Sequence, residues 1–389
     1  MNHKDFENSP AGRVIKAGQG DAAYWAFIPN PLPPDLSADW ELTRLLSEAD
    51  RALSELGGLG RTLPNPGLLV SPFLRREAVL SSRIEGTQSD ITDLYFYEAR
   101  QLDLPGIEKS TANEADVREV FNYVQALEHG LKRLAEFPVS LRLLREIHAR
   151  LMEGVRGEHA TPGEFRTRQN WIGGASINES VYVPPPVSEM NTALASLEKY
   201  LHAEDDLYPP LIRLAFIHYQ FEAIHPFVDG NGRMGRLLLS LLLVNWNLLP
   251  LPLLYLSAYF ESNRQAYYDH LLAISQRGAW GAWVTFFLNG IVHQSRDAVT
   301  RAKRLQDLQT KWRTRLQEER VTGLALGLVD MLFETPVLSA EDIRTRFGVS
   351  HPAAMTALRR FSDLGFLREM TGKDRYRRYV AEAIFEIVL

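Results

Sequence analysis

Residues 225–244 read HPFVDGNGRMGRLLLSLLLV, a polar, glycine-rich dozen that runs directly into an apolar segment. The apolar part, residues 237–244, predicts a buried helix. Gly230, Asn231 and Gly232 can adopt the positive φ angles that turn successive backbone N–H groups in one direction. The first turn of a helix adds N–H groups without intrahelical partners and the positive end of the helix dipole. We therefore interpret this stretch as an anion cradle at the start of a core helix.

The charged residues of the same stretch fit a site for a metal-bound polyphosphate. Arg233 and Arg236 are three residues apart, so both fall on one side of the helix and can hold phosphate oxygens. Asp229 is a hard oxygen donor of the kind that binds Mg²⁺ together with phosphates. His225 can accept a proton from a hydroxyl, because the ordinary pKa of histidine is about 6.5.

The reaction expected of these parts has no covalent intermediate. Residues 225–236 contain no Cys, Ser or Thr that could act as a nucleophile. Direct, in-line attack by an external hydroxyl on a phosphoryl group is the simplest chemistry for a base, a metal ligand and an anion cradle. Singly, a Gly-Asn-Gly loop is often only a turn, and a histidine before proline is often structural. The combination of all these residues within one dozen favours the functional interpretation.

The composition describes a globular chain of two or three units. The chain has 389 residues, 45% hydrophobic and 23% charged, and 43 basic against 48 acidic side chains give a formal charge of −5. This near balance excludes binding of nucleic acid or acidic lipid through net charge, so any such contact would be local. The absence of cysteine excludes disulfides, thiolate nucleophiles and Cys-based metal sites.

We expect a cytoplasmic protein without a membrane contact. The basic residues near the N-terminus are not followed by an apolar run, which argues against a secretory signal. Residues 237–256 are about as long as a membrane span requires. Two asparagines and two prolines in the second half of this segment would put amides and helix breaks into hydrocarbon. A core helix that ends near Asn247 is therefore predicted.

Hydrophobic periodicity predicts a mainly α-helical protein of four parts. Residues 1–110 begin with an irregular or extended arm and continue with amphipathic helices. Residues 111–295 hold the motif among further helices, with a loose hairpin at 169–183. Residues 296–323 form a charged helix that is expected to be a spacer, and residues 324–389 show three helices and a hairpin, the pattern of a winged helix-turn-helix with its small α+β fold. Helical spacing begins at residue 40 and returns around 73–84, 113–134, 139–152, 188–202, 210–222, 234–246, 262–274 and 280–317.

The motif resembles the signature of Fic-domain proteins, His-Pro-Phe-x-(Asp/Glu)-Gly-Asn-Gly-Arg-x-x-Arg, and matches it at every fixed position. The resemblance implies a Fic-type helical core and a protein adenylyltransferase. Such a nucleotidyltransferase moves AMP from ATP to a Tyr, Thr or Ser hydroxyl of a target protein, with Mg²⁺ as cofactor. It further implies that His225 is the general base, that Asp229 binds Mg²⁺, and that Gly230–Gly232 cradle the α- and β-phosphates. Arg233 and Arg236 would hold the outer phosphates.

Two further segments are similar to other parts of the family. Residues 169–184 resemble the flap, a hairpin that pairs with the backbone of the target by strand addition. Residues 256–268 resemble the helix near the adenosine, where Asn263 is the expected ATP contact. The flap residues expected to dock the target are Ile172, Gly173, Tyr182 and Val183.

A second family element lies upstream, at residues 81–86. Their sequence, SSRIEG, fits the inhibitory pattern (Ser/Thr)-x-x-x-Glu-(Gly/Asn), with Ser81 in the first position. Gly86 is suited to end a helix, which places Glu85 at a helix C-terminus, where a carboxylate opposes the dipole. A cation would compensate, and the resemblance implies that Arg236 is this partner. The chain is thus similar to members in which an N-terminal helix restrains the active site of the same chain.

Two alternatives to AMP transfer stay open. Some members of the family remove AMP and use the upstream glutamate to position water, so Glu85 would also suit a de-AMPylating hydrolase. A DNA-binding regulator is the other alternative, because residues 340–380 carry nine basic against five acidic side chains. The helix expected at 352–364 nevertheless offers few side chains that could read bases. For this C-terminal unit, weak DNA contact therefore stands beside protein contact or homodimerisation.

Overall fold

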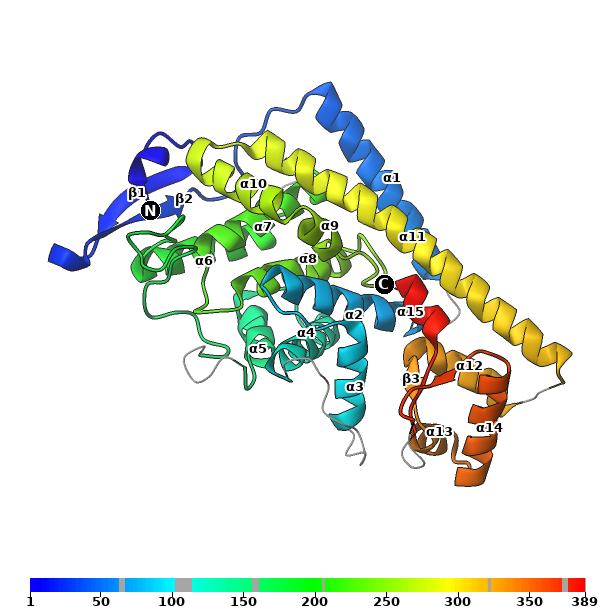
Figure 1. The fold of residues 1–389 in the computed structure, drawn as a ribbon. Coiled ribbons are helices and arrows are strands. Elements are labelled where there is room, and N and C mark those ends of the chain that lie inside the picture. Colours follow the sequence, from blue (N-terminus) through cyan, green and yellow to red (C-terminus); the bar gives the residue numbers. More distant parts are fainter. Residues whose placement is uncertain are drawn as a thin grey trace.

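The computed structural model describes residues 1–62, 67–101, 114–155, 161–204, 207–320, 323–372 and 377–388. Helices dominate and surround the central pair α7 (Pro210–Ile224) and α8 (Asn231–Asn245) (Figure 1). Two small antiparallel sheets lie near opposite ends of the molecule. The predicted mainly helical architecture is therefore confirmed.

The helices before and after the central pair follow the predicted spacing within a few residues, except that α2 begins six residues earlier, at Gly67, and that the helices at 91–101 and 257–262 fall outside the predicted ranges. The helix after the inhibitory motif begins at Ile91, because Asp90 and Asp93 cap each other's backbone N–H groups at 2.8 and 3.1 Å. Before α7 come α1 (Trp40–Thr62), α2 (Gly67–Ile84), α3 (Ile91–Gln101), α4 (Glu114–Arg133), α5 (Leu141–Leu151) and α6 (Val187–Leu201), and after α8 come α9 (Ser257–Ser262), α10 (Arg264–Arg277) and α11 (Trp280–Glu318).

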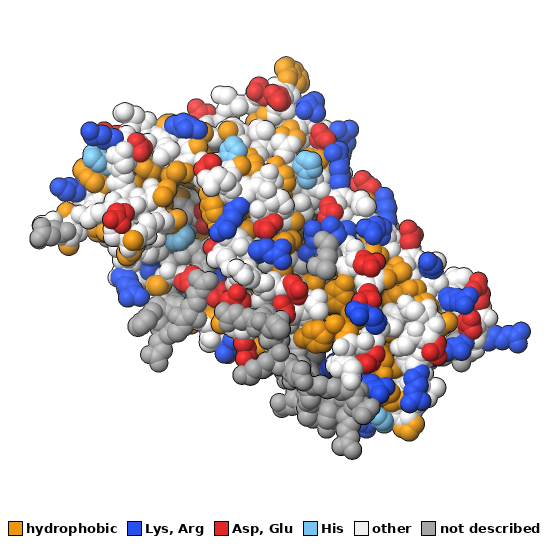
Figure 2. Space-filling model, in the orientation of Figure 1, with side chains coloured by type: hydrophobic (Ala, Val, Ile, Leu, Met, Phe, Trp, Pro, Cys, Tyr) orange, Lys and Arg blue, Asp and Glu red, His pale blue; other side chains and the backbone are white. Residues whose placement is uncertain are grey.

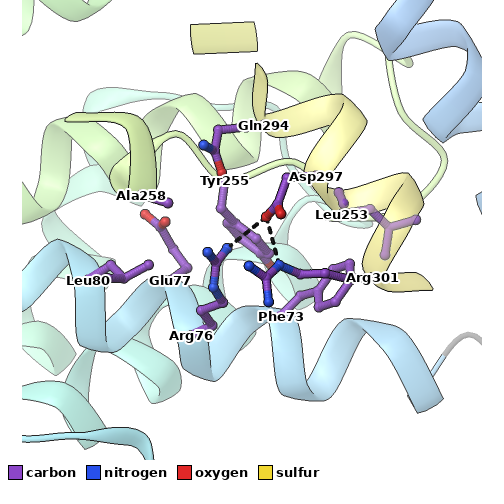
Figure 3. A pocket seen from close by; sticks show the side chains of 11 residues that line it. Phe73, Arg76, Glu77, Leu80, Leu253, Tyr255, Ala258, Gln294, Asp297 and Arg301 are labelled. Atoms are coloured by element: carbon purple, nitrogen blue, oxygen red, sulfur yellow. Dashed lines mark hydrogen bonds and ion pairs between the residues drawn. The ribbon is translucent and has the colours of Figure 1, made fainter. Parts of the chain in front are cut away.

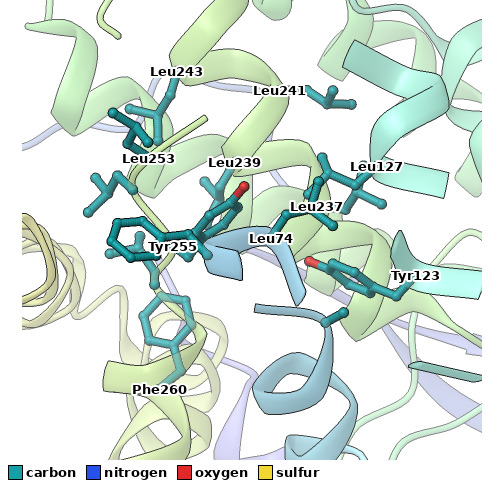
Figure 4. Close-up of a cluster of buried hydrophobic side chains, with 14 of the residues drawn as sticks. Leu74, Tyr123, Leu127, Leu237, Leu239, Leu241, Leu243, Leu253, Tyr255 and Phe260 are labelled. Carbon is teal, nitrogen blue, oxygen red and sulfur yellow. The ribbon is translucent and has the colours of Figure 1, made fainter. Parts of the chain in front are cut away.

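Helix α8 is apolar on nearly every side because other helices enclose it. Leu237 and Leu241 are fully buried, and each such leucine contributes about 1.5–3 kcal/mol to folding. They lie in one cluster with Tyr123 and Leu127 of α4 and Leu74 of α2 (Figure 4). The motif loop is thus attached to the most enclosed helix of the core. Across the parts of the chain that the structure describes, no helix combines the length and apolarity of a membrane span.

The N-terminal arm is more regular than the sequence indicates. Strands β1 (Gly12–Ala17) and β2 (Tyr24–Pro29) form an antiparallel hairpin, preceded and interrupted by short 3₁₀ turns. The ring of Phe27 lies 6.1 Å from that of Tyr182, centre to centre, and the Phe27 N–H donates to the carbonyl of Val183 at 2.9 Å. The arm therefore braces the segment expected to be the flap.

The charged half of α11 packs against the C-terminal unit instead of acting as a spacer. Trp312 and Leu316 are buried, and the Trp312 ring lies 4.7 Å from Phe366 and 5.6 Å from Phe333. The sequence pattern did not predict this packing, because the segment has few apolar residues. A few large rings nevertheless bury as much area as many small apolar residues.

The C-terminal unit contains the predicted helices and hairpin, together with a short strand and a last helix that the sequence pattern missed. The three strands pair in the order β3-β5-β4. The turn expected between the hairpin strands falls partly outside the described residues. The elements are α12 (Leu324–Glu334), β3 (Val337–Leu338), α13 (Ala340–Phe347), α14 (His351–Asp363), β4 (Arg368–Glu369), β5 (Tyr379–Val380) and α15 (Glu382–Val388).

This unit rests on α2 and α3. The Ser71 hydroxyl of α2 donates to the carbonyl of Glu334 at 3.0 Å. The Tyr95 ring of α3 meets Phe385 of α15 edge to face, with centres 5.3 Å apart. Helix α2 therefore connects the C-terminal unit with the residues of the inhibitory motif at its other end.

Candidate active site

The motif loop joins α7 to α8 and presents its backbone at the N-terminus of α8. Gly230, with φ 78°, is the residue before the helix. The side chain of Asn231 closes the loop, because its Oδ1 accepts from the Phe227 N–H at 2.8 Å and its Nδ2 donates to the Phe227 carbonyl at 2.9 Å. Asn231 therefore shapes the loop with its side chain and can offer an anion its backbone N–H in the first helical turn.

His225 is held in one tautomer. Its Nδ1 lies 3.2 Å from the carbonyl oxygen of Glu222, so Nδ1 carries the proton and Nε2 keeps its lone pair. Burial is the main cause that lowers the pKa of His225 to about 4, and Arg166 adds to it, whereas the Glu222 carbonyl opposes it. The imidazole is thus neutral at pH 7 and can accept a proton.

Asp229 fits a magnesium site that phosphates complete. Its side chain is 33% exposed, and its Oδ1 accepts from the Gly230 N–H at 2.6 Å. His148 holds the backbone of the same residue, since its Nε2 lies 3.0 Å from the Asp229 carbonyl. The described residues hold no group of three His, Asp or Glu side chains able to bind a metal by themselves. Mg²⁺ commonly takes one carboxylate together with phosphate oxygens and water, which matches this site.

The two motif arginines differ in their surroundings. The guanidinium of Arg233 is 1% exposed, and Nη1 donates to Glu119 of α4 at 2.9 Å. Its Nη2 faces the sulfur of Met152 at 3.7 Å. The same Nη2 lies 3.9 Å from Asp229 Oδ1, so the guanidinium is shared between the core and the motif loop, and its expected contact with an outer phosphate stays a prediction.

We expect Arg233→Met to destabilise the fold. The substitution leaves the Glu119 carboxylate, 5% exposed, buried without its guanidinium, and breaking one side of a buried ion pair costs about 3–5 kcal/mol. Urea unfolding followed by circular dichroism measures the change. The double variant Arg233→Met/Glu119→Leu should regain most of the loss, and an equal loss in both variants would contradict the prediction.

Arg236 makes the expected contact with Glu85 and two hydrogen bonds to Ser81 that were not expected. Its Nε donates to the Ser81 hydroxyl at 2.8 Å and its Nη2 to the Ser81 carbonyl at 2.9 Å. The same Nη2 lies 2.7 Å from Glu85 Oε1. Burial alone would lower the pKa of Arg236 and raise that of Glu85, but the pair reverses both directions. The inhibitory motif and the motif arginine thus form one charged contact.

Glu85 also covers the start of α8. It follows the last residue of α2, where Gly86 has φ 105°, as the helix-ending role predicted. A Cβ on Gly232 would lie 2.2 Å from Glu85 Oε1. The carboxylate therefore sits directly against the glycine that was assigned to the phosphate cradle.

Glu222 is a buried carboxyl that the motif match did not include. Its Oε1 has no hydrogen-bond partner within the described chain, and a Cβ on Gly235 would lie 2.3 Å from it. Burial raises the pKa of Glu222 to about 8, although Arg236 opposes this. A signal existed in the sequence, because an acidic residue in an otherwise apolar helix, three residues before His225, is unusual.

A small hollow beside α2 is separate from the motif loop. Glu77, Arg76 and Asp297 are among its lining residues, which come from α2, α11 and the segment before α9 (Figure 3). It offers about 20 Å³ to the centre of a water molecule, which is room for one. Burial raises the pKa of Glu77 to about 7 against hydrogen bonds from Ser257 and other groups. No motif residue lines this hollow, so it is not the phosphate cradle.

The expected ATP contact of Asn263 stays a prediction. Asn263 is exposed at the junction of α9 and α10, and its amide donates to the Tyr259 carbonyl at 2.9 Å. Burial raises the pKa of Tyr268, and Glu85 adds to this effect. The neighbouring Tyr267 is buried, with its hydroxyl 2.8 Å from His218 Nε2. Charges of the site, Glu85 and Arg236, thus act on both Tyr267 and Tyr268 of α10.

The predicted flap is a hairpin with a single bridge, between Ile172 and Tyr182. The Ile172 N–H donates to the Tyr182 carbonyl at 2.9 Å, and Gly173 has φ 69°. Tyr182 and Val183 were expected to dock the target. Both are buried, so their side chains are not available on the surface for docking. The exposed apolar side chains of the flap are Trp171 and Val181, at 41% and 53%.

Solved structures share this fold at low identity. A Fic family protein from Desulfovibrio desulfuricans aligns with 90% of this chain and 98% of its own, at a TM-score of 0.56 and 21% identity. A fragment of Fic-1 from C. elegans aligns with 70% of this chain and 74% of its own, at a TM-score of 0.50 and 19% identity. These likenesses show the fold.

Comparisons of sequence find relatives that match about a third of the chain. A protein adenylyltransferase Fic from Culex quinquefasciatus is 34% identical over 134 residues, which are 34% of this chain and 24% of that relative. The chain thus spans about a quarter of the length of the curated relatives it matches. The model described as Fic/DOC family N-terminal matches residues 43–132, and the model described as Fic/DOC family matches residues 138–243. With the two models covering about half of the 389 residues and the motif loop placed as the signature requires, the chain belongs to the Fic/DOC family.

Proposed function

We propose that this chain is a protein adenylyltransferase that moves AMP from ATP to a Tyr, Thr or Ser hydroxyl of a target protein, and of itself. The observation that carries the proposal is the arrangement at the start of α8. There the neutral imidazole of His225, the carboxylate of Asp229 and the guanidinium of Arg236 surround one helix N-terminus. The name of the Culex relative supports AMP as the transferred group.

The chemistry follows from the protonation of His225. Nε2 takes the proton of the acceptor hydroxyl while the oxygen attacks the α-phosphorus in line. The bond between that phosphorus and the bridging oxygen breaks, and pyrophosphate leaves with the electron pair. Mg²⁺ held by Asp229 would supply positive charge to the phosphates. The N–H groups in the first turn of α8 would stabilise the charge that develops on the phosphoryl oxygens.

Restraint by Glu85 belongs to the same proposal. The carboxylate occupies Arg236 and lies against Gly232, where an outer phosphate would otherwise bind. ATP that binds with this contact in place would have a misaligned α-phosphate, which slows transfer without abolishing affinity. The alternative role, in which Glu85 positions water for AMP removal, uses the same carboxylate.

We expect kcat/KM for ATP to be flat between pH 8 and 5 and to fall as the pH drops through about 4. The reason is that burial lowers the pKa of His225 to about 4, so the base is lost only below that pH. Initial rates of self-modification across this range test the profile, and circular dichroism at each pH controls for unfolding. A midpoint near 6.5 in a folded protein would contradict it.

Label position in ATP decides the reaction class. The purified chain is incubated with Mg²⁺ and a native lysate, with ATP labelled at either the α- or the γ-phosphate. AMP transfer places only the α-label on protein, and mass spectrometry then finds adenylate on a hydroxyl residue. Incorporation of the γ-label would instead show phosphoryl transfer. Release of AMP from a modified protein would favour the hydrolase alternative.

Several basic side chains in the described part of the C-terminal unit are paired with acidic ones. Basic and acidic side chains alternate over the face in view (Figure 2). Arg378 is 3% exposed and paired with Asp342, and four other basic residues of the expected DNA-binding region also have acidic partners. These pairs favour protein contact or dimerisation over DNA contact, and salt-dependent binding of random duplex DNA would distinguish the two. The four pairs are Arg344 with Glu341, Arg346 with Glu334, Arg360 with Glu319, and Arg368 with Glu382.

A further inference from the structure

The flap is attached to the motif loop by an unbroken series of hydrogen bonds. Residues 223 to 227 end α7 and begin the loop. Each of their carbonyl oxygens accepts a hydrogen bond from a residue at or next to one of the two ends of the flap. The donors come from Arg166, Asn170 and Tyr182. The bonds are Tyr182 Oη to Ala223 at 3.0 Å, Arg166 Nη2 to Ile224 at 3.5 Å, Arg166 Nε to His225 at 2.9 Å, Asn170 Nδ2 to His225 at 3.2 Å, Arg166 N to Pro226 at 2.9 Å, and Asn170 Nδ2 to Phe227 at 2.9 Å.

Arg166 is the centre of this series. The residue is 1% exposed. Its guanidinium also donates to the carbonyl of Pro185, just after the flap, at 2.5 Å. Its side-chain hydrogen bonds within the described chain all go to carbonyl oxygens. Burying a cation that is bonded only to carbonyls costs more desolvation free energy than burying a neutral side chain. Arginine differs from lysine in its rigid planar fork with five donors, which can bond several carbonyls at once.

The carbonyl that Arg166 and Asn170 share belongs to His225. This residue has φ 49° and ψ 61°, a backbone conformation that residues other than glycine seldom adopt. The imidazole is fixed at its other end by the bond from Nδ1 to the Glu222 carbonyl, at 3.2 Å. Arg166 and Asn170 therefore hold the backbone from which the base projects.

We propose that Arg166, assisted by Asn170, is a positioning residue that fixes the base His225 and the target-docking flap in one register. A target strand added to the flap then brings its hydroxyl to a base whose place is set by the same guanidinium. This inference rests on the proposed transfer reaction, but not on the identity of the target.

The test separates the geometry of the fork from its charge. In a Glu85→Gly background, we compare Arg166→Lys, Arg166→Met and Asn170→Ala with the control Arg145→Met. Arg145 also donates to a carbonyl of the same segment, that of Gly163 at 2.8 Å, but is 44% exposed. Self-modification with α-labelled ATP, ATP affinity by calorimetry and thermal unfolding are measured for each variant.

We expect Arg166→Lys to lower self-modification at least thirtyfold and Asn170→Ala about tenfold, with ATP affinity within threefold and the control unchanged. Full activity of a folded Arg166→Lys would overturn the proposal. Equal losses of ATP affinity and transfer would also overturn it, since the arginine would then act on the phosphate cradle. Loss of the fold in both Arg166→Lys and Asn170→Ala would show that these residues are structural.

A second readout does not depend on activity. Titration of the His225 imidazole by NMR should show a higher pKa in Arg166→Met, because the Arg166 charge that lowers the pKa of His225 is gone, and little change in Arg166→Lys. The other charges near the imidazole, Asp229 and, outside the Glu85→Gly background, Glu85, are the same in both variants. An unchanged pKa of His225 in Arg166→Met would contradict the inference that the Arg166 guanidinium acts on His225. If self-modification is absent from every protein while this shift is present, the proposed reaction fails and the placement of His225 stands.

Discussion

We expect replacement of His225 by alanine to abolish the proposed AMP transfer and to leave ATP affinity within threefold. General-base catalysis by a placed side chain contributes about 10²–10⁴-fold, and no other group of the loop has a free nitrogen lone pair of the right basicity. The nucleotide contacts proposed for α8 come from backbone N–H groups and Arg236, which this substitution does not touch. Incorporation of α-labelled AMP and calorimetric ATP binding measure the two effects, preferably with Glu85→Gly to raise the signal.

His202→Ala provides the matched control, because His202 is exposed at the end of α6 and far from the chemistry in sequence. It should incorporate label like the parent protein. Retained incorporation in His225→Ala would remove the imidazole from the role of base. Loss of ATP binding together with transfer would mean that the substitution disrupts the loop.

We expect Glu85→Gly to raise the proposed AMP transfer at least tenfold, which corresponds to about 1.4 kcal/mol of barrier. The substitution removes the carboxylate that lies 2.7 Å from Arg236 and against Gly232. Arg236 stays in place because both bonds to Ser81 remain, so its freed charge is available to an outer phosphate. Initial rates of self-modification at saturating ATP measure the change in kcat.

Arg83→Gly separates this effect from simple loosening of the helix end. Arg83 is an exposed residue in the last turn of α2, so it carries a similar loss of helix propensity without touching the ion pair. We expect its rate to stay within twofold of the parent. Equal activation by both variants would indicate that mobility of α2, and not the carboxylate, controls transfer.

Local sequence was sufficient wherever a feature depends on neighbours in the chain. The helices followed from periodicity, and the loop before α8 from its glycines. The placement of Glu85 after α2 followed from Gly86. Each of these depends on backbone preferences within a few residues, so one segment contains all the information needed.

The sequence alone did not show which distant groups the polar side chains of the site would contact. Arg233 and Arg236 lie on one side of α8 by spacing, yet Arg233 turns to Glu119, 114 residues away, and Arg236 to Ser81, 155 residues away. Asn263 was expected near the nucleotide by resemblance, and the turn of the chain after α9 directs its amide to Tyr259.

By itself, the sequence determined that a helical chain carries a glycine-rich loop with a histidine, an aspartate and an upstream glutamate. Tertiary structure decided which charges meet. Burial sets the pKa of His225, Glu222 and Glu77, the arm covers Tyr182, and Arg166 joins the flap to the loop. The physical reason is that desolvation and pairing depend on groups brought together from distant segments, whereas helix and turn formation depend on adjacent residues.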